Sequence, residues 1–375
     1  MDRKFIVTMV VAVIAVAAIA VAFYESGNTD EKETKGGFYA WNPEVVTVNG
    51  NYSNCTPAFM SIAEDVYKEV YGEVPSYSDI SRTDIPSEYL YSYTDYVVSE
   101  EEESVTILTF DNTSTGKTEA YKQKTINIPE EVICYTDAYV DTIYMIFCDY
   151  YDEKAHSGDS PQAEAALWKL IRTLPKSVID GVQSKYGLTV PSDVQVLGAT
   201  QEDLVNYCQK NTEKKIVVFM SEYNIRSTNT KSWWSINSTI ESQSSTQFVY
   251  LLSNSPGMVL STMEMIGKVI GKDNTDAMMT SVLAEIYVMQ KAIDESGKTY
   301  TFYCETNAGK AVGSNTLMGG IFASVLKMQN IFDGDLMGSS MSDEKIIEAH
   351  PEVIAFYSSD VRSDDEKMRV PTATS

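Results

Sequence analysis

The sequence contains few of the residues that carry most catalytic and metal chemistry. Only 2 histidines occur among 375 residues, so histidine-based acid–base chemistry would depend on His156 or His350. The 5 cysteines are widely spaced and form no C-x-x-C pair, which indicates neither a zinc cage nor a disulfide framework. We therefore expect a protein that is not an enzyme and that holds no cofactor of its own.

Short catalytic motifs are missing as well. The sequence has no G-x-S-x-G, H-E-x-x-H or G-x-G-x-x-G pattern, and no pair of carboxylates stands out as a glycosidase dyad. The segment 267–272 resembles a phosphate-binding loop only loosely. Its glycines are one residue too close, and Asp273 stands where that motif needs Ser or Thr.

Basic residues are scarce relative to acidic ones. Lys and Arg together number 29 against 53 Asp and Glu, which gives a formal net charge of −24. A field of this sign repels the phosphates of nucleic acids and the surfaces of anionic membranes. We therefore exclude nucleic acid as a partner and interpret the acidity as a feature that favours solubility.

The chain has one long apolar run, which lies near its N-terminus. Residues 5–24 carry no charge and are long enough to cross about 30 Å of hydrocarbon as a helix. Arg3 and Lys4 precede the run, which orients the rest of the chain away from the cytoplasm. Residues 1–24 are predicted to be a single-pass anchor in the cell membrane with an extracytoplasmic body. A cleaved signal peptide is the alternative, because residues 20–22 (AVA) resemble a cleavage site.

Two segments precede the predicted body. Residues 25–37 are polar and charged and predict a linker. Residues 38–103 form an N-terminal extension rich in tyrosine and acidic residues, with a helix expected over 58–71 and no function assigned. Four N-x-S/T glycosylation patterns fit an external location, at Asn51, Asn54, Asn112 and Asn237.

The remaining chain alternates strands and helices. A hairpin is expected over 105–110 and 119–128, and residues 161–187 resemble a helical insertion. Further strands are expected to form an α/β sheet at 132–135, 194–197, 216–219 and 248–252. We predict two Rossmann-like lobes joined by a long rigid helix: an N-terminal lobe at 104–257, the helix at 258–273, a C-terminal lobe at 274–361 and a tail at 362–375.

One supersecondary unit occurs twice, 142 positions apart. Its first copy covers residues 198–219 and its second covers 341–356. In each copy a hydroxyl residue, Thr200 or Ser342, stands where a helix N-cap is expected, acidic residues follow in the first turn, and the helix leads into an apolar strand. The repeat predicts two lobes of similar build that enclose a ligand.

Residues that follow the predicted strands are the candidate ligand contacts, because open α/β sheets bind ligands beyond the carboxyl ends of their strands. A second group comes from a Gly/Asn loop and from a polar stretch that we expect to be a loop carrying two tryptophans. Ordinary loop surface, and for the tryptophans a place in the core, are the alternatives. The candidates are Asp137, Tyr139, Glu222, Tyr223, Arg226, Trp233, Trp234, Glu305, Asn307 and Asn315.

The pattern of residues 105–360 resembles a known family, the helical-strut substrate-binding proteins of ABC importers for ferric siderophores, haem and vitamin B12. The segments that carry this resemblance are 125–135, the unit at 198–219, 263–267 and 330–354. The resemblance implies two lobes on one rigid helix and a monomer that works with an ABC permease and its ATPase. It also implies that one acidic residue on each lobe docks onto the permease, a role that falls to Glu202 and Glu344.

The chain departs from the family in several respects. A lipoprotein cysteine is missing, residues 38–103 and 161–187 are additions, and Arg226 is the sole arginine near the expected mouth of the cleft. The expected cargo is therefore a small metal chelate or a corrinoid-like molecule of open identity. A surface interaction or adhesion protein on the same scaffold is the alternative function, and an enzyme on this scaffold is disfavoured by the cysteine pattern.

Overall fold

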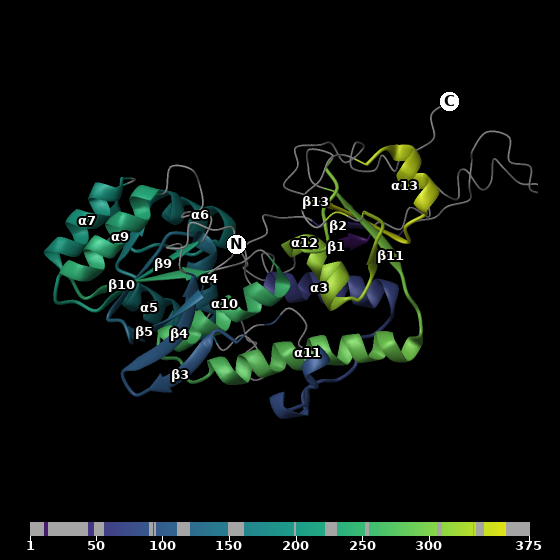
Figure 1. The fold of residues 1–375 in the computed structure, drawn as a ribbon, viewed down its shortest axis with the longest axis horizontal. Helices are drawn as coiled ribbons and strands as arrows, with labels where there is room; N and C mark the ends of the chain where they lie inside the picture. Colours follow the sequence, from purple (N-terminus) through teal and green to yellow (C-terminus); the bar gives the residue numbers. More distant parts are fainter. Residues whose placement is uncertain are drawn as a thin grey trace, which may run out of the picture.

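The computed structural model shows a mixed α/β protein with two separate groups of sheet and helix (Figure 1). It describes residues 11–13, 44–48, 56–89, 93, 95–110, 121–148, 161–198, 200–221, 231–251, 255–305, 310–332, 334 and 341–357. Within these residues no helix combines the length and apolarity that crossing a membrane requires. The predicted anchor, linker and tail lie outside them, apart from strand β1 (Val11–Val13).

The N-terminal half is a parallel sheet covered on both faces. Its strand order is β10 (Thr246–Leu251), β9 (Ile216–Ser221) and β6 (Glu131–Cys134). These strands are almost wholly buried, as their near-continuous apolar sequence requires in a parallel sheet. Helices α7 (Gln201–Lys210) and α9 (Lys231–Gln243) cover one face. Helices α4 (Asp137–Phe147) and α10 (Pro256–Val269) pack on the other.

The predicted helical insertion contains a strand that the sequence did not reveal. Between α5 (Pro161–Leu170) and α6 (Lys176–Tyr186), strand β7 (Thr173–Pro175) pairs in parallel with β8 (Gln195–Leu197). The prediction that 194–197 continues the main sheet is therefore wrong. Strand β7 is fully buried, and the backbone of β8 pairs with this nearby strand instead of with the main sheet.

The predicted hairpin is confirmed as β4 (Ser104–Phe110) and β5 (Tyr121–Asn127). Strand β3 (Val97–Glu101) joins it in an antiparallel sheet of order β3-β4-β5. This sheet lies against the N-terminal half, where the backbone N–H of Tyr250 donates to Thr109 Oγ1 at 3.2 Å. Gln247 and the backbone of β5 exchange two further hydrogen bonds of 2.8 Å.

The C-terminal half has a mixed sheet of order β1-β2-β13-β11-β12. Strand β1 is antiparallel to its neighbour β2. The other four strands are mutually parallel: β2 (Glu44–Val48), β13 (Val353–Tyr357), β11 (Thr301–Glu305) and β12 (Gln329–Asn330). Helix α13 (Asp343–Ala349) covers one face through Ile346. Helix α3 (Thr56–Val70), helix α12 (Leu317–Gly320) and a π-helical turn, η3 (Ile321–Val325), belong to the core on the other.

The described part of the predicted extension, 38–103, does not form a unit of its own. Strand β2 pairs with β13, α3 packs in the C-terminal half, and β3 joins the β4–β5 hairpin. Two single-turn 3₁₀ helices, η1 (Arg82–Asp84) and η2 (Ser87–Tyr89), lie between α3 and β3. Residues far apart in the sequence therefore complete both halves.

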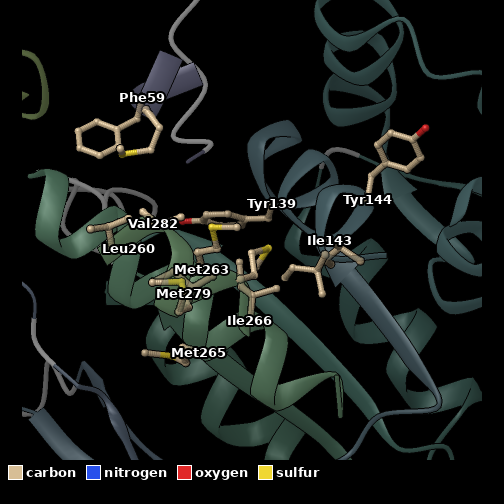
Figure 2. Packing of buried hydrophobic residues seen from close by; sticks show 14 of the residues in the cluster. Phe59, Tyr139, Ile143, Tyr144, Leu260, Met263, Met265, Ile266, Met279 and Val282 are labelled. Carbon is tan, nitrogen blue, oxygen red and sulfur yellow. The ribbon is translucent and has the colours of Figure 1, made fainter. Parts of the chain in front are cut away.

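Helix α10 links the two halves, because each end of the helix lies against a different half. Its first residue, Pro256, packs so closely on Gly320 of α12 that a Cβ at position 320 would lie 2.5 Å from the Pro256 Cδ. Beyond its other end, Asn274 donates through Nδ2 to the carbonyl oxygen of Ile146 in α4, at 2.8 Å. In Figure 2, Tyr139 of α4 points toward this helix and α11.

Helix α11 (Thr275–Ser296) then runs back toward the C-terminal half (Figure 1). Its 22 residues span about 33 Å at 1.5 Å per residue. There the Gln290 side chain donates to the carbonyl oxygen of Ser324 in η3, at 2.6 Å. The linking element is thus a pair of helices, whereas the prediction gave this role to 258–273 and assigned 274–361 to the second lobe.

Candidate functional site

The carboxyl ends of the parallel strands are the expected place for a ligand. Strand β6 leads directly into α4, while β9, β10 and β11 lead into residues 222–230, 252–254 and 306–309. Those three segments lie outside the described residues. The predicted contacts Glu222, Tyr223, Arg226 and Asn307 fall within them and remain predictions.

Asp137, the first residue of α4, faces α6. Its carboxylate lies 2.7 Å from the ammonium group of Lys185, and 16% of its side chain is exposed. Gly181 makes this approach possible, because a Cβ there would lie 2.3 Å from Asp137 Oδ2. The structure therefore places this predicted ligand contact in the packing of α4 against α6.

Tyr139 lies inside the core. Its side chain is 1% exposed and belongs to the apolar cluster that joins α4 to α10 and α11 (Figure 2). The ring points toward Leu260, Met263 and Val282 rather than to the surface. A ligand beyond the end of β6 would meet the backbone before this ring, so the structure assigns Tyr139 to helix packing.

The stretch that carries Trp233 and Trp234 is a helix, α9, and the prediction of a loop there is wrong. Ile236 and Ile240 recur at helical spacing and pack on the sheet, but serines and threonines between them hide this pattern in the composition. Asn237 faces the same way and is 1% exposed. Its predicted role as a glycosylation acceptor is incompatible with that burial in the folded chain.

Glu305 and Asn315 lie on the C-terminal half. Glu305 is the last residue of β11, and it accepts a 3.0 Å hydrogen bond from the hydroxyl of Tyr303. Asn315 is exposed in the turn before α12. In the same turn Thr316 caps α12 by accepting from the backbone N–H of Gly319 at 3.1 Å. Because Gly320 packs on Pro256, this turn lies beside the start of α10.

The two predicted docking acids occupy the same position in equivalent helices. Glu202 is the second residue of α7, after the N-cap Thr200, and Glu344 is the second residue of α13, after the N-cap Ser342. Both side chains are exposed. The duplicated sequence unit therefore produces the same local geometry once in each half.

Different groups surround these two acids. In α7 a capping box joins Thr200 to Asp203, whose pKa is lowered by hydrogen bonds from the Thr200 hydroxyl and backbone, and Glu202 stays outside the box. In α13 the pKa of Glu344 is lowered because its carboxylate accepts hydrogen bonds from its own backbone N–H and from the Ser342 hydroxyl. Glu344 is thus held partly toward its own helix, and Glu202 is directed to solvent.

The described residues contain no group of three or more His, Cys, Asp or Glu side chains able to hold a metal ion. A hollow of about 100 Å³ lies between α7 and α9, lined by Val205, Cys208, Ile236 and Ile240 among others. Pockets for drug-sized ligands are about 300–1,000 Å³ in volume, so this hollow is too small for a metal chelate. The residues that follow the carboxyl ends of the strands therefore remain the candidate ligand contacts.

The structure thus consists of two covered sheets that are linked by a pair of helices, and each half carries a capped helix with an exposed acid in its first turn. No family model matches the chain, and no curated protein matches it. Among solved structures it is similar to a TroA-like periplasmic binding protein from Xylanimonas cellulosilytica, with 17% identity and a TM-score of 0.44 over 71% of this chain and 84% of that one.

Two further solved structures are similar to the chain. One is the siderophore periplasmic binding protein from the fuscachelin gene cluster of Thermobifida fusca, with 12% identity and a TM-score of 0.40 over 61% of this chain and 76% of that one. The other is the periplasmic vitamin B12 binding protein BtuF of Vibrio cholerae, with 9% identity and a TM-score of 0.37 over the same shares, 61% and 76%.

Proposed function

We propose that the chain is a membrane-anchored, extracytoplasmic solute-binding protein with two Rossmann-like lobes. It captures an iron chelate, haem or a cobalamin-like molecule between the lobes and delivers it to an ABC permease that works with its ATPase. It acts by binding and not by catalysis. A membrane anchor at residues 5–24 requires strand β1 (Val11–Val13) to leave the edge of the C-terminal sheet, where β2 is its partner.

The matched positions of Glu202 and Glu344 carry this proposal. Each acid is exposed on the second residue of a capped helix, where the N-terminal end of the helix dipole stabilises negative charge. One such acid on each half supplies two separate contacts for a single partner with basic pockets. Charged rims of this kind steer association and fix orientation, which a delivery protein requires.

The proposed ligand contacts are the polar and aromatic residues beyond the strands: Glu222, Tyr223, Arg226, Trp233, Trp234, Glu305, Asn307 and Asn315. Arg226 supplies the positive charge that an anionic chelate needs, and the aromatic residues supply flat apolar surface for a macrocycle. Asp137 and Tyr139 support α4 behind this region.

The test is a thermal-shift screen of the purified full-length chain in detergent, using ferric siderophores, haem and cobalamins as separate probes. A ligand at a hundred times its dissociation constant stabilises the folded state by about 2.7 kcal/mol, which is a readily measured shift. Binding of one class with Kd below about 1 µM is expected. No stabilisation by any of the three classes contradicts the proposed cargo.

A further inference from the structure

The segment between α3 and β3 lies along the helix pair that links the halves. In Figure 1 its two 3₁₀ turns are drawn in blue next to α11. We call residues 82–93 the brace segment; its described residues are 82–89 and 93. The sequence assigned this segment no role.

Its first attachment is an ion pair with a buried glutamate of α10. Arg82 Nη1 lies 2.7 Å from Glu264 Oε1, and 5% of the Glu264 side chain is exposed. The hydroxyl of Tyr93 donates to the other carboxylate oxygen of Glu264 and accepts from Arg82 Nη2 at 2.6 Å. Both oxygens of a carboxylate inside the fold are therefore satisfied by the brace segment, and an unpaired charge at this depth is strongly unfavourable.

Its second attachment is an aromatic contact with α11 and with the C-terminal half. The ring of Tyr89 meets the ring of Tyr287 edge to face, with centroids 5.0 Å apart. The ammonium group of Lys327, two residues beyond η3, lies 5.1 Å from the Tyr89 centroid and 2.5 Å from Asp294 of α11. One side chain of the brace segment thus contacts both the linking helix and the end of the π-helical turn.

These attachments meet around one closely packed junction. Tyr89 and Tyr93 line it together with residues of α10, α11 and η3, and the space left between them is about 10 Å³. Such a space holds a single water at most. The residues that line it are Tyr89, Tyr93, Pro256, Gly257, Leu260, Leu283, Ile286, Gln290, Ser324 and Val325.

We propose that the described residues of the brace segment, 82–89 and 93, lock α10, α11 and the turn at 321–327 into one rigid unit and so fix the spacing of the two halves. The ion pair holds the segment to α10, and Tyr89 holds it to α11 and to Lys327. Two antiparallel helices in contact can slide or splay, and a third element bonded to both removes that freedom. The inference depends on the fold and is independent of the proposed cargo.

The test compares two variants of the full-length chain with a matched control. R82M/E264Q removes both charges of the ion pair without leaving either one buried alone, and Y89L removes the aromatic contact. K124M is the control, because Lys124 forms a partly exposed ion pair with Glu241 that lies within the N-terminal half alone. Spin labels incorporated as non-canonical amino acids at the exposed positions Lys210 and Glu348 report the distance between the halves.

Both brace variants are expected to broaden the distance distribution between Lys210 and Glu348. Amide hydrogen exchange in 256–269 and 275–296 should become at least about tenfold faster, while exchange in β6, β9 and β10 stays near the control. If the distribution stays as narrow as that of K124M, or if exchange rises equally in all elements, the segment contributes only to global stability and the proposal is wrong.

Discussion

Glu64 of α3 and Glu285 of α11 share a hydrogen bond across the interface of their helices. Glu285 is 1% exposed, and its pKa is raised far above the usual range by burial and by the hydrogen bond and negative charge of Glu64. The pKa of Glu64 is lowered, first by its hydrogen bond with Glu285 and then by Lys68, whose ammonium group lies 2.9 Å away. The pair therefore holds one proton at neutral pH.

This shared proton predicts that the protein loses stability as pH rises. The raised pKa of Glu285 means that the folded state binds a proton that the unfolded state releases above about pH 4.5. Protonated Glu285 therefore contributes its full stability below about pH 4.5. As pH rises from there toward the folded-state pKa, this contribution is lost progressively, with a slope of at most about 1.4 kcal/mol per pH unit. Urea unfolding from pH 5 to 8 measures this slope.

The variant E285Q should flatten that dependence. Glutamine keeps a donor toward Glu64 and needs no proton, so E285Q is expected to be more stable than the parent at pH 7.5 by about 1–2 kcal/mol. E295Q, at an exposed acid on the same helix, should leave the slope unchanged. An E285Q protein with the parent's slope would show that the pair does not share a proton.

Gly181→Ala should destabilise the N-terminal half although alanine favours helix. The added Cβ would lie 2.3 Å from Asp137 Oδ2 and 2.9 Å from its Cβ, so α6 must move away from α4. Overpacking of this kind costs about 1–3 kcal/mol, more than the roughly 1 kcal/mol that alanine contributes to a helix over glycine. Thermal unfolding measures the loss, and D137A/G181A should recover part of it; a G181A protein as stable as the parent contradicts the close packing.

Asn237→Ala is expected to lower the free energy of unfolding by about 1–3 kcal/mol, because it removes a buried donor from the hydroxyl of Tyr250, 2.9 Å away. The control is T239A, which destroys the glycosylation pattern at an exposed position. Denaturant unfolding should separate the two variants. Equal losses in both would instead indicate a glycan on Asn237 as the stabilising group.

The double variant E202A/E344A should lose delivery and keep ligand binding. Uptake of a radiolabelled ligand by cells is expected to fall at least about tenfold, because charged rim contacts govern association with a partner. E213A/E348A removes the same charge from neighbouring exposed positions and serves as the control. Unchanged uptake in E202A/E344A would contradict docking and favour a surface interaction role without transport.

Local signals in the sequence were sufficient to predict most of the helices and strands. The Thr200 and Ser342 caps, the acids behind them and the apolar strands that follow are short-range features, and the structure has each of them at the predicted position. The hairpin of β4 and β5 was predictable for the same reason, because alternation and turn chemistry act between residues close in the chain. Helix α9 was missed because its polar face dominates its composition.

The sequence by itself determined the α/β class, the duplicated capped helices and the acidic surface, since these depend on residue type and near neighbours. The tertiary structure alone decided that β2 enters the C-terminal sheet, that Asp137 and Tyr139 serve packing, and that Arg82 meets Glu264 182 positions away. Such pairings depend on which surfaces meet in three dimensions, and the free energy of burying a charge or a ring has no counterpart in local sequence pattern.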